Sequence, residues 1–416
     1  MPSIQAPRGA PDILPPRSGT YERVVRRCED LFRAYGYRRI ETPAFEHTEV
    51  FERGLEAGSD IVVKEMYTFA DRKGRSLTLR PEGTAPIVRA VIDHGLDRGS
   101  LPIKLYYTAS MFRYERPQAG RQRAFLQVGV EALGSPGPEI DAEVVELGAA
   151  ALRAMGLSAV NLHLNSIGHP VCRGRYLPEL VGFLEERRSE LCGDCRRKVT
   201  TNPLRTFDCK VERDREVMRH APRITDYLCA ECRGHFDDLQ GLLGDLGVAF
   251  TLDPRLVRGL DYYTRTTFSF VAAGLGAQNE LGGGGRYDGL SEQLGGGPLP
   301  GIGFALGVDR IALALEGQGE PSPGGLDVFV VTDGQAACSG ALLLASKLRA
   351  DGLSVDLDYT GRGLKGQFRA ADRAGARRVV VVGDPEASTL TVRNMATGEE
   401  AEVPAQELGA HLRGGG

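Results

Sequence analysis

Two long segments place apolar residues at the spacing of an amphipathic helix. In residues 21–35 the apolar positions follow the 3.6-residue period, and Gly36 then favours an end to the helix. Residues 38–43 continue as an extended segment that ends at Pro43. Residues 138–155 begin with a proline, carry acidic residues early and precede a glycine, so they predict a second long helix.

Short runs typical of strands lie between and after these helices. Residues 65–69 and 76–79 flank a polar turn and predict a β-hairpin. Residues 104–108 and 125–131 predict two strands on either side of an arginine-rich loop. The strand pattern returns at residue 266 and continues through a run of glycines at 282–285.

Three further patterns indicate the domain organisation. Residues 300–315 predict a turn followed by a helix, and the Gly/Pro-rich segment 316–325 then favours a domain boundary. Residues 170–252 are charged and helix-rich, and they contain six of the eight cysteines. Residues 326–416 alternate as β-α-β-α-β, which predicts a mostly parallel sheet covered by helices.

Composition excludes several classes of protein. Of the 416 residues, 42% are hydrophobic and 25% are charged, which is typical of a globular chain. No apolar run approaches the roughly 20 residues of a membrane span, and the N-terminus lacks the apolar core of a secretory signal. We therefore expect a cytoplasmic protein, whose eight cysteines are reduced thiols or metal ligands rather than a disulfide framework.

The chain lacks the two common glycine-rich nucleotide motifs, the P-loop and the dinucleotide-binding fingerprint. A nucleotide would therefore be held by side chains. Arg113, Arg121 and Arg123 can clamp phosphate oxygens with their forked guanidinium groups, although a solvated charged loop is an equally ordinary interpretation. Arg310 follows the glycines of residues 301–307, which by themselves suggest close packing of a helix on a sheet.

Taken together, these segments resemble class II aminoacyl-tRNA synthetases in order and spacing. The three class motifs are matched by residues 34–43 (AYGYRRIETP), by Phe112-Arg113 with Glu115, and by residues 301–310 (GIGFALGVDR). Residues 256–264 (LVRGLDYYT) resemble a signature peptide of histidyl-tRNA synthetases, which is a more specific match. Residues 284–289 (GGRYDG) and 78–84 (TLRPEGT) resemble two further segments of that family.

The resemblance implies both a fold and a reaction. The fold is an α+β catalytic domain with an antiparallel sheet in residues 1–325, a helical insertion at about 170–252, and an α/β anticodon-binding domain in residues 326–416. The reaction is histidine–tRNA ligation: ATP activates L-histidine as an adenylate, and histidine then passes to the 3′ end of tRNA(His). Mg²⁺ is expected with ATP, and tRNA(His) and a second copy of the chain are the expected macromolecular partners.

The resemblance also assigns roles to individual residues. Arg113 and Arg258 would flank the α-phosphate as the catalytic pair, while Arg121 and Arg310 would reach the γ-phosphate and Glu115 would complete the ATP site. The expected histidine-binding residues are Glu82, Thr84, Gln127, Glu131, Tyr263 and Tyr287. Without the resemblance, the two tyrosines would be interpreted as core aromatic residues. The family usually has an acidic residue after residues 266–268, where this chain has Ser269.

Two other functions are open to a chain of this kind. The regulatory subunit of ATP phosphoribosyltransferase resembles the catalytic core but does not aminoacylate, and it normally lacks both the arginine of the signature and the anticodon module. Here Arg258 and residues 326–416 argue against it. A class II synthetase for another amino acid is disfavoured by residues 256–264. Residues 21–43 are expected to form the seam of the homodimer.

Two C-x-x-C pairs in the insertion suggest a structural metal. Four thiolates suit tetrahedral Zn²⁺, and we predict one such site, with Cys209 left as a spare thiol. Reduced cysteines on separate helices are the alternative. A redox pair is disfavoured because neither motif opens a helix after a strand. The predicted ligands are Cys192, Cys195, Cys229 and Cys232.

Overall fold

The structure, a computed structural model, describes residues 3–54, 61–157, 159–272, 279–318, 325–334, 338–383 and 388–414. The chain divides into two compact units, Met1–Pro321 and Ser322–Gly416. The division falls in the segment expected to be a linker, of which residues 319–324 lie outside the described residues. Within the described part of the chain, no helix has the length and apolar character needed to cross a membrane.

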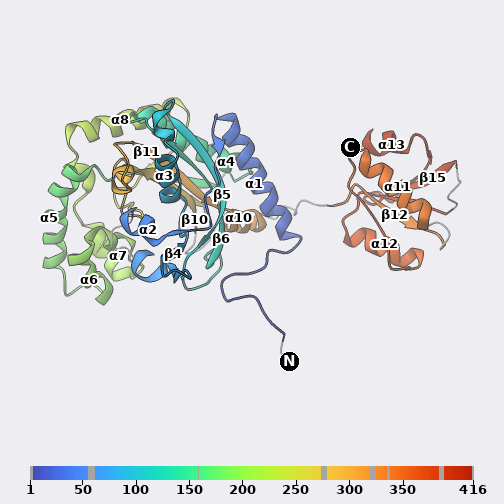
Figure 1. The fold of residues 1–416 in the computed structure, drawn as a ribbon, viewed down its shortest axis with the longest axis horizontal. Helices are drawn as coiled ribbons and strands as arrows, with labels where there is room; N and C mark the ends of the chain where they lie inside the picture. Colours follow the sequence, from blue (N-terminus) through green and yellow to red (C-terminus); the bar gives the residue numbers. More distant parts are fainter. Residues whose placement is uncertain are drawn as a thin grey trace. The chain divides into compact units, whose positions relative to one another are not determined.

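An eight-stranded sheet forms the centre of the first unit (Figure 1). Its spatial order is β1-β5-β6-β11-β10-β9-β7-β8, and the six strands from β5 to β7 pair antiparallel. The short edge strands β1 and β8 pair parallel to their neighbours. The strands are β1 (Arg38–Arg39), β5 (Ile103–Phe112), β6 (Ala124–Leu133), β7 (Val160–Ser166), β8 (Thr251–Leu252), β9 (Thr264–Ala272), β10 (Glu280–Arg286) and β11 (Gly301–Gly307).

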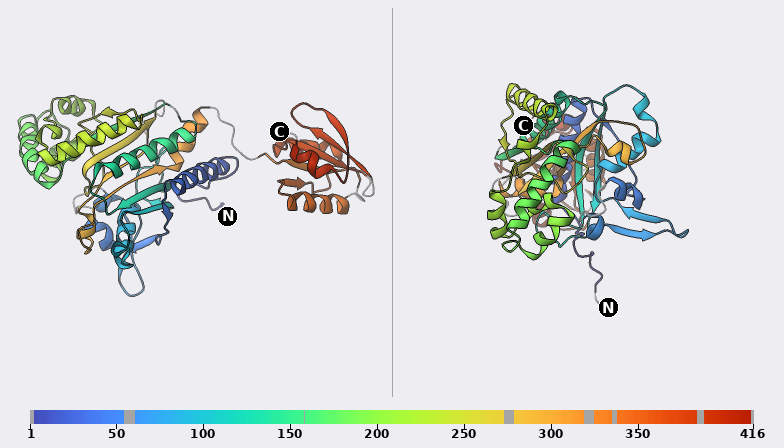
Figure 2. Two further views of the ribbon diagram at one scale, coloured as in Figure 1. Left: turned by 90° about the horizontal axis from the view of Figure 1, so that it is seen from above. Right: turned by 90° about the vertical axis from the view of Figure 1, so that its left-hand side faces the viewer.

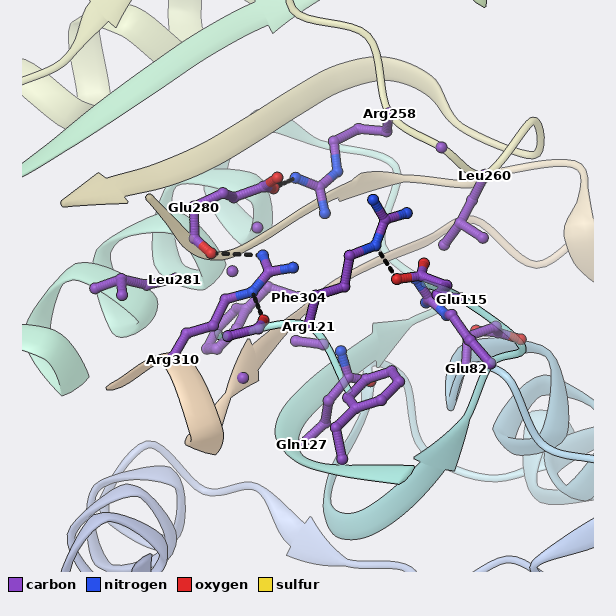
Figure 3. Close-up of a pocket in the computed structure, with 18 of the residues that line it drawn as sticks. Glu82, Glu115, Arg121, Gln127, Arg258, Leu260, Glu280, Leu281, Phe304 and Arg310 are labelled. Carbon is purple, nitrogen blue, oxygen red and sulfur yellow. Dashed lines mark hydrogen bonds and ion pairs between the residues drawn. The ribbon is translucent and has the colours of Figure 1, made fainter. Parts of the chain in front are cut away.

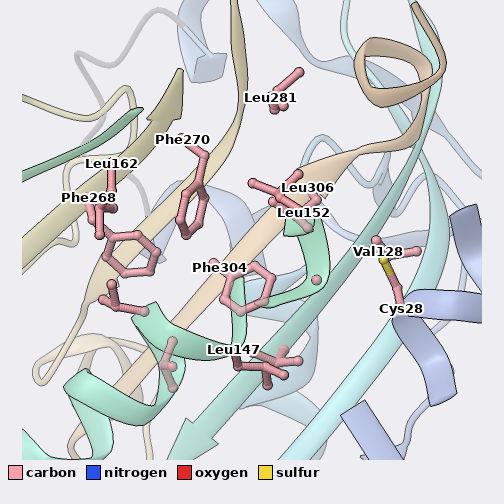
Figure 4. Close-up of a cluster of buried hydrophobic side chains, with 14 of the residues drawn as sticks. Cys28, Val128, Leu147, Leu152, Leu162, Phe268, Phe270, Leu281, Phe304 and Leu306 are labelled. Carbon is pink, nitrogen blue, oxygen red and sulfur yellow. The ribbon is translucent and has the colours of Figure 1, made fainter. Parts of the chain in front are cut away.

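Helices α1, α4, α8 and α10 cover one face of this sheet (Figure 2). Their apolar stripes meet the inward side chains of the central strands, where Phe268, Phe270 and Phe304 pack edge to face with ring centroids 5.7–6.5 Å apart (Figure 4). Such aromatic pairs add stabilisation beyond the area they bury. The helices are α1 (Arg17–Ala34), α4 (Pro138–Ala154), α8 (Ala230–Asp245) and α10 (Val308–Gly317).

A second apolar cluster lies on the opposite face of the sheet. Along β5, Tyr106 packs into the first cluster, whereas Leu105 and Tyr107 pack into the second, as the alternation of a strand requires. The second face carries α2 (Thr48–Gly54), α3 (Thr84–Asp93) and α9 (Leu290–Gln293). A small antiparallel sheet, β2-β4-β3, stands beside them and consists of β2 (Phe45–His47), β3 (Tyr67–Ala70) and β4 (Ser76–Leu79). Its β3–β4 hairpin confirms the sequence prediction.

The insertion between β7 and β8 is helical, as predicted. Apolar side chains of α5, α6 and α7 join the second cluster, so this part of the insertion packs on the same face as α3, whereas α8 packs on the other face. Its elements before α8 are α5 (Pro170–Glu186), α6 (Gly193–Thr201), η3 (Pro203–Asp208), α7 (Glu212–Arg219) and η4 (Ile224–Tyr227).

The second unit has the predicted α/β pattern. Strands β12 (Val328–Thr332), β13 (Val355–Leu357) and β14 (Arg378–Val382) pair parallel, and helices α11 (Cys338–Ala350) and α12 (Leu364–Arg373) connect them. The sheet continues antiparallel through β15 (Thr389–Asn394) and β16 (Glu400–Pro404), and α13 (Leu408–Gly414) follows.

One predicted element is wrong at its start. Residues 301–307 form strand β11 between β6 and β10, and the helix begins only at Val308. The strand signal was present: Ile302, Phe304 and Leu306 alternate, and all three are buried against the helical face. The glycines between them therefore belong to a strand rather than to the contact between a helix and a sheet.

Candidate active site

A cavity of about 580 Å³ lies against strands β6, β10 and β11 (Figure 3). It gathers nine of the eleven residues expected to bind substrates, from segments far apart in the sequence. These nine are Glu82, Thr84, Arg113, Glu115, Arg121, Gln127, Arg258, Tyr263 and Arg310. Glu131 and Tyr287 do not line the cavity directly, but Thr84 links them to it, because its hydroxyl donates to Glu131 at 2.7 Å.

The floor of the cavity is made by glycines in β10 and β11. An added Cβ at any of four positions would stand only 1.9–2.8 Å from a functional side chain. The clashes would be with Arg258 at Gly283, Tyr263 at Gly285, Tyr287 at Gly301 and Glu131 at Gly303. The absence of side chains on these strands therefore creates the space in which the polar residues lie.

Three arginines on the nucleotide side are oriented by hydrogen bonds. Arg310 donates from Nε to the Gly120 carbonyl at 2.8 Å and from Nη1 to the Glu280 carbonyl at 2.7 Å. Arg121 pairs with the carboxylate of Glu115. Figure 3 shows Arg121, Arg258 and Arg310 reaching the cavity from three separate elements. Guanidinium groups fixed in this way form a ready site for polyanions.

Arg113 follows the end of β5 and is held in two ways. Its Nε donates to the Pro81 carbonyl at 2.8 Å, and its guanidinium carbon lies 5.5 Å from the centre of the Phe125 ring. Phe125 belongs to β6 and Pro81 to the segment before α3, so these two elements fix the direction of the guanidinium group. The arginine is therefore positioned before any ligand arrives.

Arg258 is paired with Glu280, a residue that the sequence analysis missed. Burial would raise the pKa of Glu280, but Arg258 and Arg310 outweigh it and lower the pKa, so the carboxylate stays ionised. Ser269 hydrogen-bonds to Glu280. An acidic group is thus present beside Ser269, contributed by the adjacent strand β10.

The opposite end of the site contains a buried carboxylate. Glu131 is 1% exposed and accepts hydrogen bonds from the hydroxyls of Thr84 and Tyr287. Burial raises the pKa of Glu131 to about 8, although these two hydrogen bonds oppose the shift and Glu82 adds to it. A buried acceptor of this kind favours a ligand that brings its own N–H.

Glu82 and the tyrosines complete this end. The Glu82 carboxylate accepts the backbone N–H groups of Thr84 at 2.6 Å and Ala85 at 2.9 Å, so it also caps helix α3. The hydroxyl of Tyr262 approaches Glu82 at 3.3 Å, and the rings of Tyr262 and Tyr263 lie 4.9 Å apart. Tyr263 is therefore both a cavity residue and part of an aromatic cluster.

Tyr287 is fixed by the residue before it. Arg286 and Asp141 form an ion pair in which both side chains are completely buried. Arg286 also donates to the carbonyls of Ser135 and Gly137, each at 3.0 Å, and to Asp288 at 2.9 Å. Thr266 donates to Asp141 at 2.6 Å. Because removal of one partner would leave an unpaired buried charge, this network holds the end of β10 firmly.

The insertion supplies one wall of the cavity, which the sequence did not predict. Lys198, Arg205, Asp208 and Lys210 line it. Arg205 pairs with Asp208 at 2.6 Å, and Asn202 donates to Asp261 of the signature peptide at 3.1 Å. These four charged residues belong to no recognisable sequence motif, so only the folded structure shows that they line the cavity.

Comparison with known families agrees with this geometry. A family model described as "Histidyl-tRNA synthetase" matches residues 9–311, and one described as "Anticodon binding domain" matches residues 327–414. The chain belongs to the histidyl-tRNA synthetase family. The first match contains every residue of the cavity, and the second falls within the second compact unit.

Curated relatives cover nearly the full chain. A protein of Moorella thermoacetica named "Histidine--tRNA ligase" is 51% identical over 96% of this chain and 95% of its own length. A Nocardia farcinica protein of the same name is 50% identical over 99% of this chain and 98% of its own length. These matches place the chain among synthetases of the family.

Solved structures show the same architecture. The apo histidyl-tRNA synthetase of S. aureus is 40% identical, with a TM-score of 0.80 over 99% of this chain and 100% of the other. A Bacillus halodurans protein described as an ATP phosphoribosyltransferase regulatory subunit/histidyl-tRNA synthetase is 24% identical, with a TM-score of 0.66 over 92% of this chain and 100% of its own. The latter match concerns the fold alone.

The predicted four-thiolate site is wrong in its composition. Cys192 and Cys195 group with Cys209 and an aspartate, whereas Cys229 and Cys232 group with a histidine and another cysteine. The two C-x-x-C pairs sit on different helices, α6 and α8, and each pair finds its own partners. Cys209, expected to be a spare thiol, belongs to the first group.

We predict that Gly303→Ala displaces Glu131. The new methyl group would stand 1.9 Å from Oε2 of Glu131, and overpacking of this kind costs about 1–3 kcal/mol. The free energy of unfolding should fall accordingly in urea titrations. Gly297→Ala is the matched control, because nothing lies within 4 Å of its added Cβ. If both variants unfold with the same free energy, the predicted clash between a Cβ at position 303 and Glu131 is wrong.

We predict that Glu131→Gln is relatively more stable at higher pH. The wild-type carboxyl has a pKa near 8 when folded and about 4.5 when unfolded, so wild-type stability is lost as pH rises between these values. The amide does not titrate, and the difference in unfolding free energy should therefore grow in its favour from about pH 5 to pH 8. Glu52→Gln, at an exposed position of α2, is the control variant to be measured alongside. A pH-independent difference for Glu131→Gln would contradict the shift.

Proposed function

We propose that the chain is a histidine–tRNA ligase that works in two steps. Histidine first attacks the α-phosphorus of ATP and releases pyrophosphate, and the resulting adenylate then transfers histidine to the 3′-terminal ribose of tRNA(His). One observation carries the proposal: a single cavity has oriented arginines at one end, and at the other end Tyr263 and Thr84, whose hydroxyl donates to the buried carboxyl group of Glu131. The first set suits a nucleotide, and the second suits an imidazole ring.

The arginines account for catalysis of the first step. Negative charge spreads over the α-phosphoryl oxygens in the transition state, and preorganised cations lower its energy. Arg113 and Arg258 reach the cavity from β5 and from the signature peptide, so they can hold the α-phosphate between them. Arg121 and Arg310 lie further along and would contact the γ-phosphate. Glu115 pairs with Arg121, and Glu280 pairs with Arg258, so carboxylates balance the charge of two of these cations.

Carboxylates beside Arg121 fit the Mg²⁺ that accompanies ATP. Glu65 and Glu115 both face Arg121: Nη2 of Arg121 is 3.9 Å from Glu65, and its Nε pairs with Glu115. Burial and repulsion from Glu115 raise the pKa of Glu65, as expected for neighbouring carboxyl groups. Mg²⁺ prefers oxygen ligands and is usually held by one or two carboxylates together with substrate phosphates. Glu65 and Glu115 would hold it, and it would neutralise charge on the phosphates.

The carboxylate end accounts for selection of histidine. A ring N–H can donate to Glu131, and Tyr263 and Tyr287 can satisfy the other ring nitrogen. Glu82, Thr84 and Gln127 are placed to receive the α-ammonium group. Amino acids that leave Glu131 unpaired are penalised, and sites built on such polar pairing discriminate strongly.

The principal test is ATP–pyrophosphate exchange with each amino acid in turn. We expect exchange with histidine alone in the wild-type protein. Arg258→Ala should reduce this exchange by about 10²–10³-fold while histidine still binds, because the lost interaction is strongest in the transition state.

Arg255→Ala is the control for this variant. Arg255 lies in the same segment, but its side chain is 51% exposed and faces Asp253 rather than the cavity. Exchange in Arg258→Ala that stays within a few-fold of wild type would disprove its role. Absence of exchange with every amino acid in the wild type would instead support a regulatory protein.

Helix α12 in the second unit is the proposed contact for tRNA. Lys365, Arg369 and Arg373 recur every four residues, so they form one exposed basic face. Phosphate contacts by such side chains release counterions and make binding sensitive to salt.

We predict that the triple variant Lys365→Ala/Arg369→Ala/Arg373→Ala binds tRNA(His) roughly tenfold more weakly or worse, with a flatter salt dependence. Histidine–ATP exchange should be unaffected, since the cavity lies wholly within the first unit. Lys347→Ala/Arg413→Ala, at other exposed positions of the same unit, is the control. An unchanged dissociation constant and salt slope in the triple variant would place the tRNA contact elsewhere.

A homodimer in the cytoplasm is the proposed working form. Residues 21–43 remain the predicted seam, although Val24 and Phe32 of this segment pack into the chain's own core. The small sheet adds a second apolar surface, where Phe45 and Phe69 are 50% and 44% exposed with ring centroids 6.4 Å apart. An isologous interface above about 1,000 Å² is expected there.

Sedimentation velocity should give a species of twice the 44.9 kDa chain mass. Phe45→Ser/Phe69→Ser should shift it toward monomer, because the apolar contact is lost from both copies. Leu96→Ser, which changes another exposed apolar residue, should leave the dimer intact. A wild-type monomer at micromolar concentration would contradict the dimer itself.

A further inference from the structure

Three short motifs in the insertion share one geometry. In His169-x-x-Cys172, Cys192-x-x-Cys195 and Cys229-x-x-Cys232, the first residue caps the N-terminus of a helix. In each motif the backbone N–H of the second residue points back at the side chain of the first, at 3.4 Å. Such an arrangement favours a thiolate at the two cysteine caps and an unprotonated Nδ1 at His169, because the N–H group and the helix dipole both face the capping atom.

Two of these motifs come together as a four-ligand group. His169 and Cys172 meet Cys229 and Cys232, and the four ligand atoms all lie within 4.8 Å of one another. Nε2 of His169 is 3.7 Å from Sγ of Cys229, and the backbone N–H of Cys229 points at Sγ of Cys172 at 3.2 Å. This group joins the start of α5, which follows β7 directly, to the start of α8.

The third motif completes a separate group. Cys192 and Cys195 meet Cys209 and Asp214, again within 4.8 Å. Sγ of Cys192 is 3.9 Å from Sγ of Cys209, and Asp214 accepts the backbone N–H of Cys192 at 3.0 Å. Asp214 also accepts from Sγ of Cys209 at 3.4 Å.

These separations fit ligands around an ion better than they fit a disulfide. Tetrahedral ligands at roughly 2.3 Å from zinc lie about 3.8 Å apart, whereas bonded sulfurs are about 2.05 Å apart. All eight cysteines of the chain are free thiols. The ligand sets, three sulfurs with a nitrogen and three sulfurs with an oxygen, are both chemistry that Zn²⁺ accepts.

We propose that the insertion binds two zinc ions, one at His169/Cys172/Cys229/Cys232 and one at Cys192/Cys195/Cys209/Asp214. Each site is closed by four protein ligands, so neither ion takes part in the ligation reaction. The ions act by fixing helices whose small apolar core would otherwise stabilise them only weakly.

The second ion has a consequence for the cavity. Its ligands come from the start of α6, from the residue after η3, and from α7. The chain between the first and third ligands carries Lys198, Arg205 and Asp208, which line the cavity wall. Loss of this ion should therefore loosen the wall, whereas the first ion anchors the base of the insertion.

The test is metal analysis of the full chain, purified under reducing conditions without chelators from zinc-supplemented cells. We expect two zinc ions per chain. Cys232→Ser and Cys195→Ser should each lower the content to one, and the double variant should contain none. Cys28→Ser and Cys338→Ser are the matched controls and should retain two, because neither residue belongs to a ligand group.

A second measurement uses the wild-type protein and does not depend on the folding of variants. Titration with a mercurial reagent should release two zinc ions to a chromogenic chelator, and cobalt substitution should give the visible bands of tetrahedral, thiolate-bound Co²⁺. Limited proteolysis within residues 193–214 should accelerate after the metal is removed. Wild-type protein without stoichiometric zinc and with eight freely titrating thiols would overturn the proposal. A single ion lost equally in both single variants would show one shared site and would overturn it too.

Discussion

The site depends on a sheet surface that carries almost no side chains. Glycines at 283, 285, 301 and 303 occupy positions where a methyl group would overlap Arg258, Tyr263, Tyr287 or Glu131. Glycine weakens a strand, because it loses more backbone entropy on folding and contributes no packing. The other face compensates: Ile302, Phe304 and Leu306 of β11 are buried there beneath α4 and α10. One face of β10 and β11 thus provides stability, and the other provides space.

Electrostatic balance is the second requirement of the cavity. Four arginines in one enclosed site would repel one another, and here each is paired with a carboxylate or donates to backbone carbonyls. These contacts hold the guanidinium groups in place. Because the groups are already oriented, little free energy is needed to reorganise the site when an anion binds. Glu280 of β10 pairs with Arg258 and also hydrogen-bonds to Ser269 of the adjacent strand, so a negative charge lies beside this serine.

The sequence predicted what depends on local spacing and missed what depends on long-range contact. The β3–β4 hairpin, the long helices and the parallel part of the second unit followed from periodicity and turn residues. Strand β11 was missed because glycines concealed the alternation of Ile302, Phe304 and Leu306. Glu280 and the insertion wall carried no motif, and only pairing with Arg258 or folding over the cavity reveals them. The cysteine partners were partly visible, since His169 precedes Cys172 at the same spacing as the two C-x-x-C pairs.

The buried Arg286–Asp141 pair gives the site a mechanical connection through the sheet. Asp141 belongs to α4, on the face away from the cavity, and His235 of α8 approaches the same carboxylate at 3.6 Å. Arg286 is followed directly by Tyr287, whose hydroxyl meets Glu131. A shift of α4 or α8 would therefore move Tyr287 and Glu131 through Arg286. The residues that line the cavity would not need to be substituted for this to happen. Substitutions in α4 or α8 could therefore change the affinity of the cavity for its ligand, although these helices lie on the other face of the sheet.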